Sequence, residues 1–328
     1  MDKYILPYKI TNKMLDYISK IMEKVGEINS YINLNKMPEL RKQNRINSIH
    51  SSLAIENNQL SLFQVEDVIN GRMVIGDKKD IQEVKNAYEA YNKISQINPY
   101  SIEDLKLVHG IMTFLIEEEN GRFRSHGEGV YDGDKCIFVA PSEKLVPELM
   151  ENLFSWMKES KDTVHPLILS SVFHYEFVFI HPFGDGNGRM ARLWQSALLS
   201  KWKEIFEYVP IESLIKKYQE EYYKIIDNCN KSGESTEFIE FMLKMIYETI
   251  DKILIEQNST KETTEEKIIN LIKMNPNITQ NEMAEKLGLT RDGISYNIKN
   301  LKDKKIIKRI GSHKTGTWKI LKNKRTRF

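Results

Sequence analysis

Residues 181–192 read His-Pro-Phe-Gly-Asp-Gly-Asn-Gly-Arg-Met-Ala-Arg, and this stretch decides how the chain is organised. It lies between two helical runs, an apolar one from Ile168 to Ile180 and a second from Met190 to Trp202. The stretch is therefore predicted to be a tight loop that ends at a helix N-terminus. Free backbone N–H groups and the helix dipole favour a bound anion at such a position.

The residues of this loop suit phosphate binding. Gly184, Gly186 and Gly188 permit positive φ angles and a close approach of the backbone to phosphate oxygens. Arg189 and Arg192 are three residues apart on the first helical turn, so each guanidinium can fork onto phosphate from one face.

Two further side chains suit a transfer reaction on phosphate. Asp185 is placed to hold a hard cation such as Mg²⁺ between phosphates. His181 stands at the loop entry, where a general base is wanted. Phosphoryl transfer depends mainly on positioning and charge stabilisation, so this small set of groups matches its needs.

The stretch also matches every specified position of the pattern His-x-Phe-x-Asp/Glu-Gly-Asn-Gly-Arg-x-x-Arg, and on these residues the chain resembles the Fic family. The matching residues are His181, Phe183, Asp185, Gly186, Asn187, Gly188, Arg189 and Arg192. The usual reaction of that family moves AMP from ATP to a protein hydroxyl and releases pyrophosphate. The resemblance therefore implies a protein adenylyltransferase acting on Ser, Thr or Tyr, with ATP as substrate and Mg²⁺ or Mn²⁺ as cofactor.

The resemblance also implies a role for each part of the loop. His181 would deprotonate the target hydroxyl, and Asp185 would hold the metal against the α- and β-phosphates. Asn187 and the glycine-rich backbone would fix the α-phosphate, and the two arginines would bind the outer phosphates. Phe183 is expected to anchor the loop in the core. Doc, of the wider superfamily, has Lys at the position of Gly188 and acts as a kinase, so this glycine favours AMP transfer.

A second motif lies upstream. Residues 52–57 read Ser-Leu-Ala-Ile-Glu-Asn and resemble the inhibitory pattern Ser/Thr-x-x-x-Glu-Gly/Asn of Fic proteins at Ser52, Glu56 and Asn57. Glu56 falls at the end of a predicted helix, where the dipole disfavours a carboxylate, so a cationic partner is expected. The resemblance names Arg192 and implies that the pair replaces the γ-phosphate and inhibits transfer. In some relatives the same glutamate supports AMP removal, so a bifunctional enzyme stays open.

Between Gly121 and Pro141 the composition changes to Gly, Tyr, Val, Ile and Phe. Two β-prone runs around Asp132-Gly133 predict a hairpin. The resemblance implies that this hairpin is the flap, on whose edge an extended target segment docks. The residues expected to form it are Val130, Tyr131, Cys136, Ile137, Phe138 and Val139.

The whole chain predicts a mainly α fold in four parts. Residues 1–98 read as amphipathic helices that carry the inhibitory motif, and residues 99–256 read as the all-helical catalytic core with its small hairpin. The polar stretch 257–263 reads as a linker. Residues 264–328 predict an α+β winged helix-turn-helix domain, with three helices followed by two short strands.

Charge is divided unevenly between these parts. The net charge is +2, but residues 262–328 carry 16 Lys and Arg against 7 Asp and Glu, and the preceding residues 32 against 39. A basic C-terminal domain predicts a separate partner, and its third helix and wing would suit DNA phosphates. The candidate contacts are Arg291, Ser295, Tyr296, Asn297, Lys299 and Lys314. Winged helices also dock proteins, so both kinds of partner stay open.

The remaining features are those of a soluble cytoplasmic protein without a membrane partner. No apolar run reaches the roughly 18 residues of a membrane span, and Met1 to Ile10 does not resemble a signal peptide. The two cysteines, Cys136 and Cys229, imply neither a disulfide framework nor a zinc site.

Two other functions compete with AMP transfer. A DNA-binding transcriptional regulator would use the nucleotide domain only as a sensor, but His181 and Asp185 would then be expendable. A phosphotransferase is disfavoured by Gly188. Self-modification and a homo-oligomer are expected as family traits, while the residues name neither the target nor the preferred metal.

Overall fold

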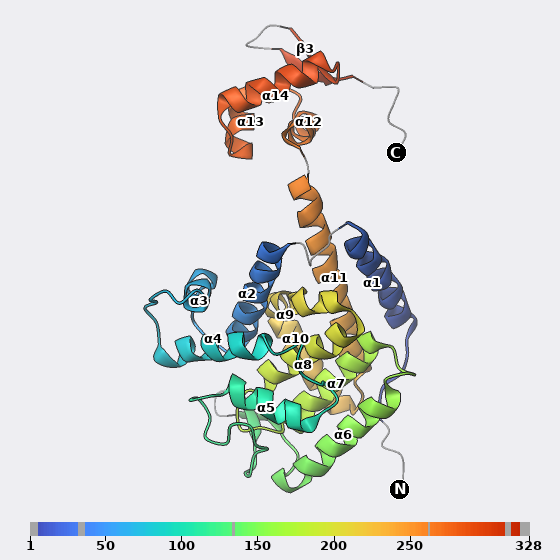
Figure 1. Ribbon diagram of the computed structural model, residues 1–328. Coiled ribbons are helices and arrows are strands. Elements are labelled where there is room, and N and C mark those ends of the chain that lie inside the picture. The colour runs from blue at the N-terminus through green and yellow to red at the C-terminus, as the bar shows by residue number, and fades with distance from the viewer. Residues whose placement is uncertain (1–5, 32–36, 133–134, 262, 312–315, 322–328) are drawn as a thin grey trace. The chain divides into compact units, whose positions relative to one another are not determined.

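The computed structural model describes residues 6–31, 37–132, 135–261, 263–311 and 316–321, with side chains except at 29–31, 130–137 and 257–261. Contacts divide the chain into two units, residues 1–252 and 253–328, and both are mainly helical (Figure 1). The mainly α fold class is therefore confirmed. Among the described helices, none combines the length and the apolar character that crossing a bilayer requires.

The described part of residues 1–98 is mainly helical, as predicted. Its helices are α1 (Asn12–Tyr31), α2 (Pro38–Ile55), α3 (Leu62–Ile69) and α4 (Lys78–Tyr91). In the sequence, the apolar spacing from Ile81 to Ile97 predicts the last of these helices over that range. The helix instead begins at Lys78, because the Asp77 side chain accepts the Lys79 N–H as an N-cap.

The residues that follow α4 contribute further helices around the hairpin. They are α5 (Ile102–Met112), η2 (Glu143–Leu145), α6 (Val146–Ser160), α7 (Pro166–Ile180), α8 (Asn187–Trp202), η3 (Glu204–Tyr208), α9 (Ile211–Lys217), α10 (Gln219–Ser232) and α11 (Thr236–Lys261). In the sequence, the apolar spacing predicts α5 over Ile102 to Glu117. It ends at Met112 because Leu115 has a positive φ of 60° and the Asn86 side chain donates to the Phe114 carbonyl at 2.7 Å.

Helices α7 and α8 pack together at the centre of the first unit (Figure 1). Most α7 residues are buried, as expected of a helix that is apolar on every face. Trp194 of α8 is completely buried, and its indole N–H donates to the Pro99 carbonyl at 3.0 Å. These two helices therefore form a rigid frame for the loop between them.

The predicted hairpin is present as β1 (Gly129–Asp132) paired antiparallel with β2 (Lys135–Val139). A bulge shifts the register between Val130 and Tyr131. The predicted Asp132-Gly133 turn lies partly outside the described residues.

The stretch predicted as a linker, 257–263, is helical as far as Lys261, because α11 continues into it. Its sequence, Gln-Asn-Ser-Thr-Lys from 257 to 261, contains no Gly or Pro that would end a helix. The domain boundaries 1–98, 99–256 and 264–328 stay a prediction.

The second unit has the predicted winged-helix order. It contains α12 (Thr264–Met274), α13 (Gln280–Leu287), α14 (Arg291–Asp303) and the antiparallel pair β3 (Ile307–Ile310) and β4 (Thr317–Ile320). Capping boxes at Thr263 and Thr279 start the first two helices. The small core gathers around Trp318, whose indole N–H donates to the Ile278 carbonyl at 2.9 Å.

Candidate active site

Two residues with left-handed backbone conformation and one buried aromatic side chain fix the loop between α7 and α8. Helix α7 ends where His181 takes a left-handed φ of 52°, and α8 begins after Gly186 at a φ of 82°. Phe183 is buried and stacks on the His109 ring with 3.6 Å between centroids. Phe183 therefore anchors the loop in the core, as predicted.

Asn187 closes the loop on itself. Its side-chain oxygen accepts the Phe183 N–H at 3.0 Å, and its amide nitrogen donates to the Phe183 carbonyl at 2.7 Å. Because this buried side chain is already engaged, an α-phosphate contact by Asn187 would have to come from its backbone N–H at the start of α8.

His109 of α5 holds the loop at Asp185. Its Nδ1 accepts the Gly121 N–H at 2.9 Å, so its Nε2 carries the proton and donates to the Asp185 carbonyl at 2.9 Å. Burial lowers the pKa of His109 to about 4, which keeps the ring neutral. No sequence motif indicates this bond from His109 to the loop.

Asp185 and Arg189 form an ion pair at the mouth of the loop. Asp185 Oδ2 lies 2.8 Å from Arg189 Nη2, and Asp185 Oδ1 accepts the Gly186 N–H at 2.6 Å. Burial alone would raise the pKa of Asp185, but the guanidinium and this N–H bring it below its ordinary value. Arg189 also reaches Glu83 of α4 at 3.4 Å, a buried partner that no sequence motif indicated.

His181 has the orientation and charge state of a base. Its Nδ1 lies 3.3 Å from the Val178 carbonyl. We assign the proton to Nδ1, which donates to this carbonyl, so the lone pair is on Nε2. Burial lowers the pKa of His181 below its ordinary 6.5. The imidazole is therefore neutral near neutral pH and able to accept a proton.

Glu56 and Arg192 form the expected ion pair. Arg192 Nη2 lies 2.8 Å from Glu56 Oε1 and donates to the Ser52 carbonyl at 2.9 Å, while its Nε donates to Ser52 Oγ at 3.0 Å. Burial alone would lower the pKa of Arg192, but the Glu56 carboxylate raises it above its ordinary value. Asn57 follows with a φ of 66° and turns the chain away from α2.

The Glu56 carboxylate lies against the backbone of Gly188. A Cβ atom at this position would come within 2.2 Å of Glu56 Oε1 and 3.1 Å of Arg192 Nη1. The absence of a side chain thus admits a negatively charged group to the first turn of α8. This is where the glycine-rich motif predicted an anion site.

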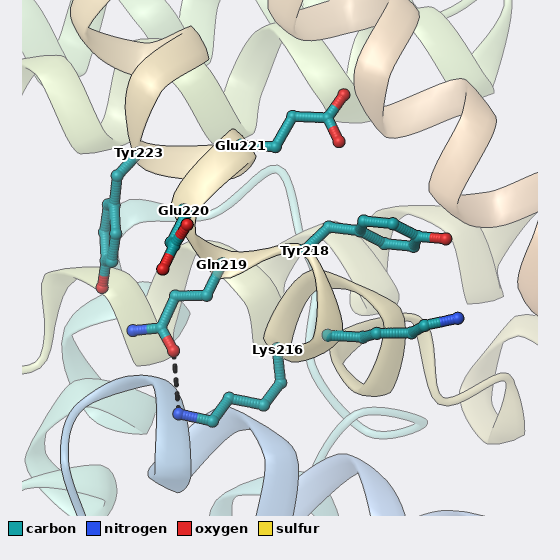
Figure 2. Close-up of a pocket in the computed structure, with 7 residues that line it drawn as sticks. Lys216, Tyr218, Gln219, Glu220, Glu221 and Tyr223 are labelled. Carbon is teal, nitrogen blue, oxygen red and sulfur yellow. Dashed lines mark hydrogen bonds between the residues drawn. The ribbon is translucent and has the colours of Figure 1, made fainter.

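The C-terminal end of α2 is held by two polar side chains from the α9–α10 region. Lys216 Nζ donates to the Ala54 carbonyl at 2.7 Å, and Gln219 Nε2 donates to the Ile55 carbonyl at 3.1 Å. Lys216 also donates to Gln219 Oε1 at 2.8 Å (Figure 2). A cation at a helix C-terminus is favourable, and here it fixes the residues just before Glu56.

An open pocket of about 560 Å³ adjoins this end of α2, lined by Lys216, Lys217, Tyr218, Gln219, Glu220, Glu221 and Tyr223 (Figure 2). Three tyrosines of this region, Tyr218, Tyr222 and Tyr223, have rings that could stack on an adenine base or pack in the core. Tyr222 packs, because it is buried and its hydroxyl lies 2.9 Å from His174 Nε2. Tyr223 is exposed and presents its ring at the pocket.

His174 is a packed structural residue. It is buried, its Nδ1 lies 2.6 Å from Gln195 Oε1, and burial lowers its pKa to about 3. Burial raises the pKa of nearby Glu176 to about 7. Across the described residues, no group of three or more His, Cys, Asp or Glu side chains is arranged to hold a metal.

The hairpin lies close to the end of α7. The Phe138 ring of β2 is 5.7 Å from that of Phe179, two residues before His181, and Val139 is 74% exposed. The side chains of the other predicted flap residues, Val130, Tyr131, Cys136 and Ile137, lie outside the described part.

In the second unit, α14 exposes several of the predicted DNA contacts. The exposed residues are Arg291, Ser295, Tyr296 and Lys299. Asn297 is half-buried, and its amide donates back to the Gly293 carbonyl at 2.8 Å, so this nitrogen is engaged within the helix. Lys314 lies outside the described residues.

Comparison with known proteins agrees with both parts of this geometry. Residues 99–199 match the family model described as Fic/DOC family, and residues 261–308 match the one described as winged helix-turn-helix DNA-binding. A "Protein adenylyltransferase Fic" of Nematostella vectensis is 26% identical over 259 residues, 75% of this chain and 57% of that protein. One of Aedes aegypti is 29% identical over 223 residues, 65% of this chain and 42% of that protein. The chain thus spans about half the length of these curated relatives.

A solved structure extends the similarity over nearly the whole chain. The crystal structure of a Fic family protein from Desulfovibrio desulfuricans G20 has a TM-score of 0.75 and 34% sequence identity, and the match covers 98% of this chain and 100% of that one. Because the identity exceeds 30% and the match covers both chains almost completely, the protein described here belongs to the Fic family.

Proposed function

We propose that this protein is an adenylyltransferase that moves AMP from ATP to a Ser, Thr or Tyr hydroxyl of a protein, and that Glu56 inhibits the reaction. The observation that carries the proposal is the carboxylate of Glu56 against the Gly188 backbone, held there by Arg192. It supports an anion subsite at the α8 N-terminus, which the carboxylate fills in place of a phosphate. The relatives named adenylyltransferase support the same reaction.

In the proposed reaction, His181 Nε2 takes the proton of the target hydroxyl. The hydroxyl oxygen attacks the α-phosphorus of ATP, a new P–O bond forms, and the bond to the bridging oxygen breaks. Pyrophosphate leaves, and the guanidinium groups of Arg189 and Arg192 stabilise its charge. The pocket beside Tyr223 offers a place for the adenine ring of ATP.

Asp185 is the side chain that would hold Mg²⁺ or Mn²⁺. It is 40% exposed, and Mg²⁺ commonly takes one or two carboxylates together with substrate phosphates, so a single carboxylate fits this ion. The ion would neutralise phosphate charge. Arg189 has Glu83 as a second partner, so its charge stays paired when Asp185 holds a cation.

The position of a label in ATP tests the reaction. The purified chain is incubated with Mg²⁺, cell lysate and ATP labelled at either the α- or the γ-phosphate. We expect protein to acquire the α-label and not the γ-label, and the chain itself is one candidate target. Transfer of the γ-label alone would indicate a kinase and overturn the proposal. ATP-dependent DNA binding with no label in protein would instead support the regulator with a nucleotide sensor.

The pH dependence of transfer should follow His181. Because burial lowers the pKa of His181 below its ordinary 6.5, the imidazole stays neutral at pH 6.5. We therefore expect the acid limb of the kcat/KM profile to lie below this pH. The profile is measured on the Glu56→Gly variant so that inhibition does not mask it. An acid limb above pH 6.5 would contradict the assignment of His181 as a buried, neutral base.

We also propose that residues 264–328 bind DNA. The winged-helix match and the exposed Arg291 and Lys299 of α14 support this. Each substitution, Arg291→Ala or Lys299→Ala, should weaken binding to a mixed-sequence duplex and reduce the slope of log affinity against log salt by roughly 1. Lys273→Ala is the matched control, because Lys273 is an exposed lysine on a different helix of this unit, α12. Full affinity in both α14 variants would indicate a protein-docking role for this unit.

Three further points remain proposals or predictions. A homo-oligomer is supported by the exposed apolar side chains of Phe63, Met73 and Ile75 in and after α3. AMP removal by the same site would need Glu56 to orient a water. The cytoplasmic location stays a prediction from the sequence.

A further inference from the structure

Arg124 is a buried arginine that bonds only to backbone carbonyls in the described part of the chain. It is 3% exposed, and its Nε donates to the His181 carbonyl at 2.7 Å. Nη1 donates to the His126 carbonyl at 2.7 Å, and Nη2 donates to the Pro141 carbonyl. The backbone N–H of Arg124 donates to the Pro182 carbonyl at 2.9 Å.

A buried charge is costly unless its hydrogen bonds are made. Burial lowers the pKa of Arg124, which is the expected sign of that desolvation. The planar guanidinium, with five N–H donors, is the side chain suited to reaching several carbonyls at once. The desolvation of Arg124 is offset by hydrogen bonds to three defined backbone carbonyls. This arrangement indicates that Arg124 positions the segments that carry those carbonyls.

The carbonyls that Arg124 binds belong to the hairpin and to the loop after α7, the two segments that act on the target protein in the proposed function. His126 precedes β1 and Pro141 follows β2, so these residues are the two roots of the hairpin. His181 and Pro182 begin the catalytic loop. One side chain therefore joins both roots of the flap to the backbone of the general base.

We propose that Arg124 is a positioning residue that fixes the flap hairpin relative to His181, and so sets how a docked target hydroxyl meets the imidazole. This inference rests on the proposed function, in which an extended target segment pairs with the flap. Arg124 binds the carbonyl of His181 and leaves its imidazole free. Among the described residues it makes no hydrogen bond or ion pair with the segment from Gly186 to Arg192, so its loss should spare nucleotide binding.

The test uses the full chain with Glu56→Gly, to which Arg124→Lys is added. Lysine keeps the charge but has no planar fork, so it cannot reproduce the bonds to both hairpin roots and the loop. Arg122→Lys is the matched control, because this exposed neighbour makes one long bond, at 3.3 Å, to the Glu118 carbonyl. Arg124→Gln is a second variant that removes the charge as well. Thermal melting first establishes that every variant is folded.

We expect Arg124→Lys and Arg124→Gln to lower kcat/KM for the protein target by roughly 100-fold, because a misplacement of about 1 Å can have that effect. ATP affinity, measured by calorimetry, should change by less than about twofold, since the phosphate subsite is untouched. The Ala140 N–H, bonded to the Glu128 carbonyl at 3.0 Å between the hairpin roots, should exchange with solvent faster by roughly tenfold. Arg122→Lys should leave all three quantities unchanged.

Two results would overturn the inference. One is an equal loss of ATP affinity and transfer, which would show general damage to the loop. The other is unchanged exchange at the Ala140 N–H. The exchange measurement requires no activity: if Glu56→Gly transfers no AMP but exchange rises only in the Arg124 variants, the proposed function fails and the anchoring of the hairpin stands.

Discussion

Replacing Glu56 with glycine is expected to raise the rate of AMP transfer by about 100-fold, within the usual range for coupling between an inhibitory contact and a site. The substitution removes the carboxylate that lies against Gly188 and breaks its ion pair with Arg192. The γ-phosphate of ATP can then take this position, which aligns the α-phosphate for attack. Initial rates with α-labelled ATP, for the wild-type chain and the variant, measure the effect.

Two other variants show which property of Glu56 inhibits. Glu56→Gln keeps the size of the side chain but not its charge, so activation should be partial. Ser52→Ala removes the hydroxyl that accepts from Arg192 Nε at 3.0 Å and leaves the ion pair, so activation should be smaller still. Equal rates with and without Glu56 would retain the transferase and exclude its inhibition by this residue.

Adding His181→Ala to the Glu56→Gly variant is expected to lower transfer by roughly 1,000-fold, within the range for loss of a general base. The neutral imidazole, with its lone pair on Nε2, is the group placed to accept the hydroxyl proton. ATP affinity should persist, because the arginines and the α8 N-terminus are unchanged. Calorimetry and labelling on the same preparations separate binding from chemistry.

His165→Asn is the matched control for that experiment. His165 caps α7 by accepting the Leu167 N–H, and asparagine is also a good N-cap, so helix and activity should both be retained. Strong labelling in the Glu56→Gly/His181→Ala chain would show that another group takes the proton.

The sequence predicted the ends of those helices that are set by caps and apolar spacing within the helix itself. The sequence predicts a helix over Thr264 to Met274, and α12 has these ends, since the Thr263 cap and the apolar spacing are both readable from the sequence. Helix α5 ends early because Asn86, on another helix, binds a carbonyl near its end. Such a bond between distant segments leaves no periodic signal.

The same distinction holds in the site. The resemblance pointed to the loop of residues 181–192 and to the Glu56–Arg192 pair, because these residues carry recognisable motifs. Arg124, His109 and Lys216 were missed, since each binds a backbone carbonyl contributed by a remote segment. A carbonyl is present at every position, so no residue pattern reveals which one a side chain will reach.

The missing side chain at Gly188 has a consequence for how this protein can diverge. A methyl group there would meet the Glu56 carboxylate at 2.2 Å, so any larger residue would displace it from Arg192. Under the proposed function, a lysine at 188, the residue associated with transfer of a different phosphate, would therefore also release the inhibition by Glu56. The identity of the transferred group and the inhibition would then change together, through one residue.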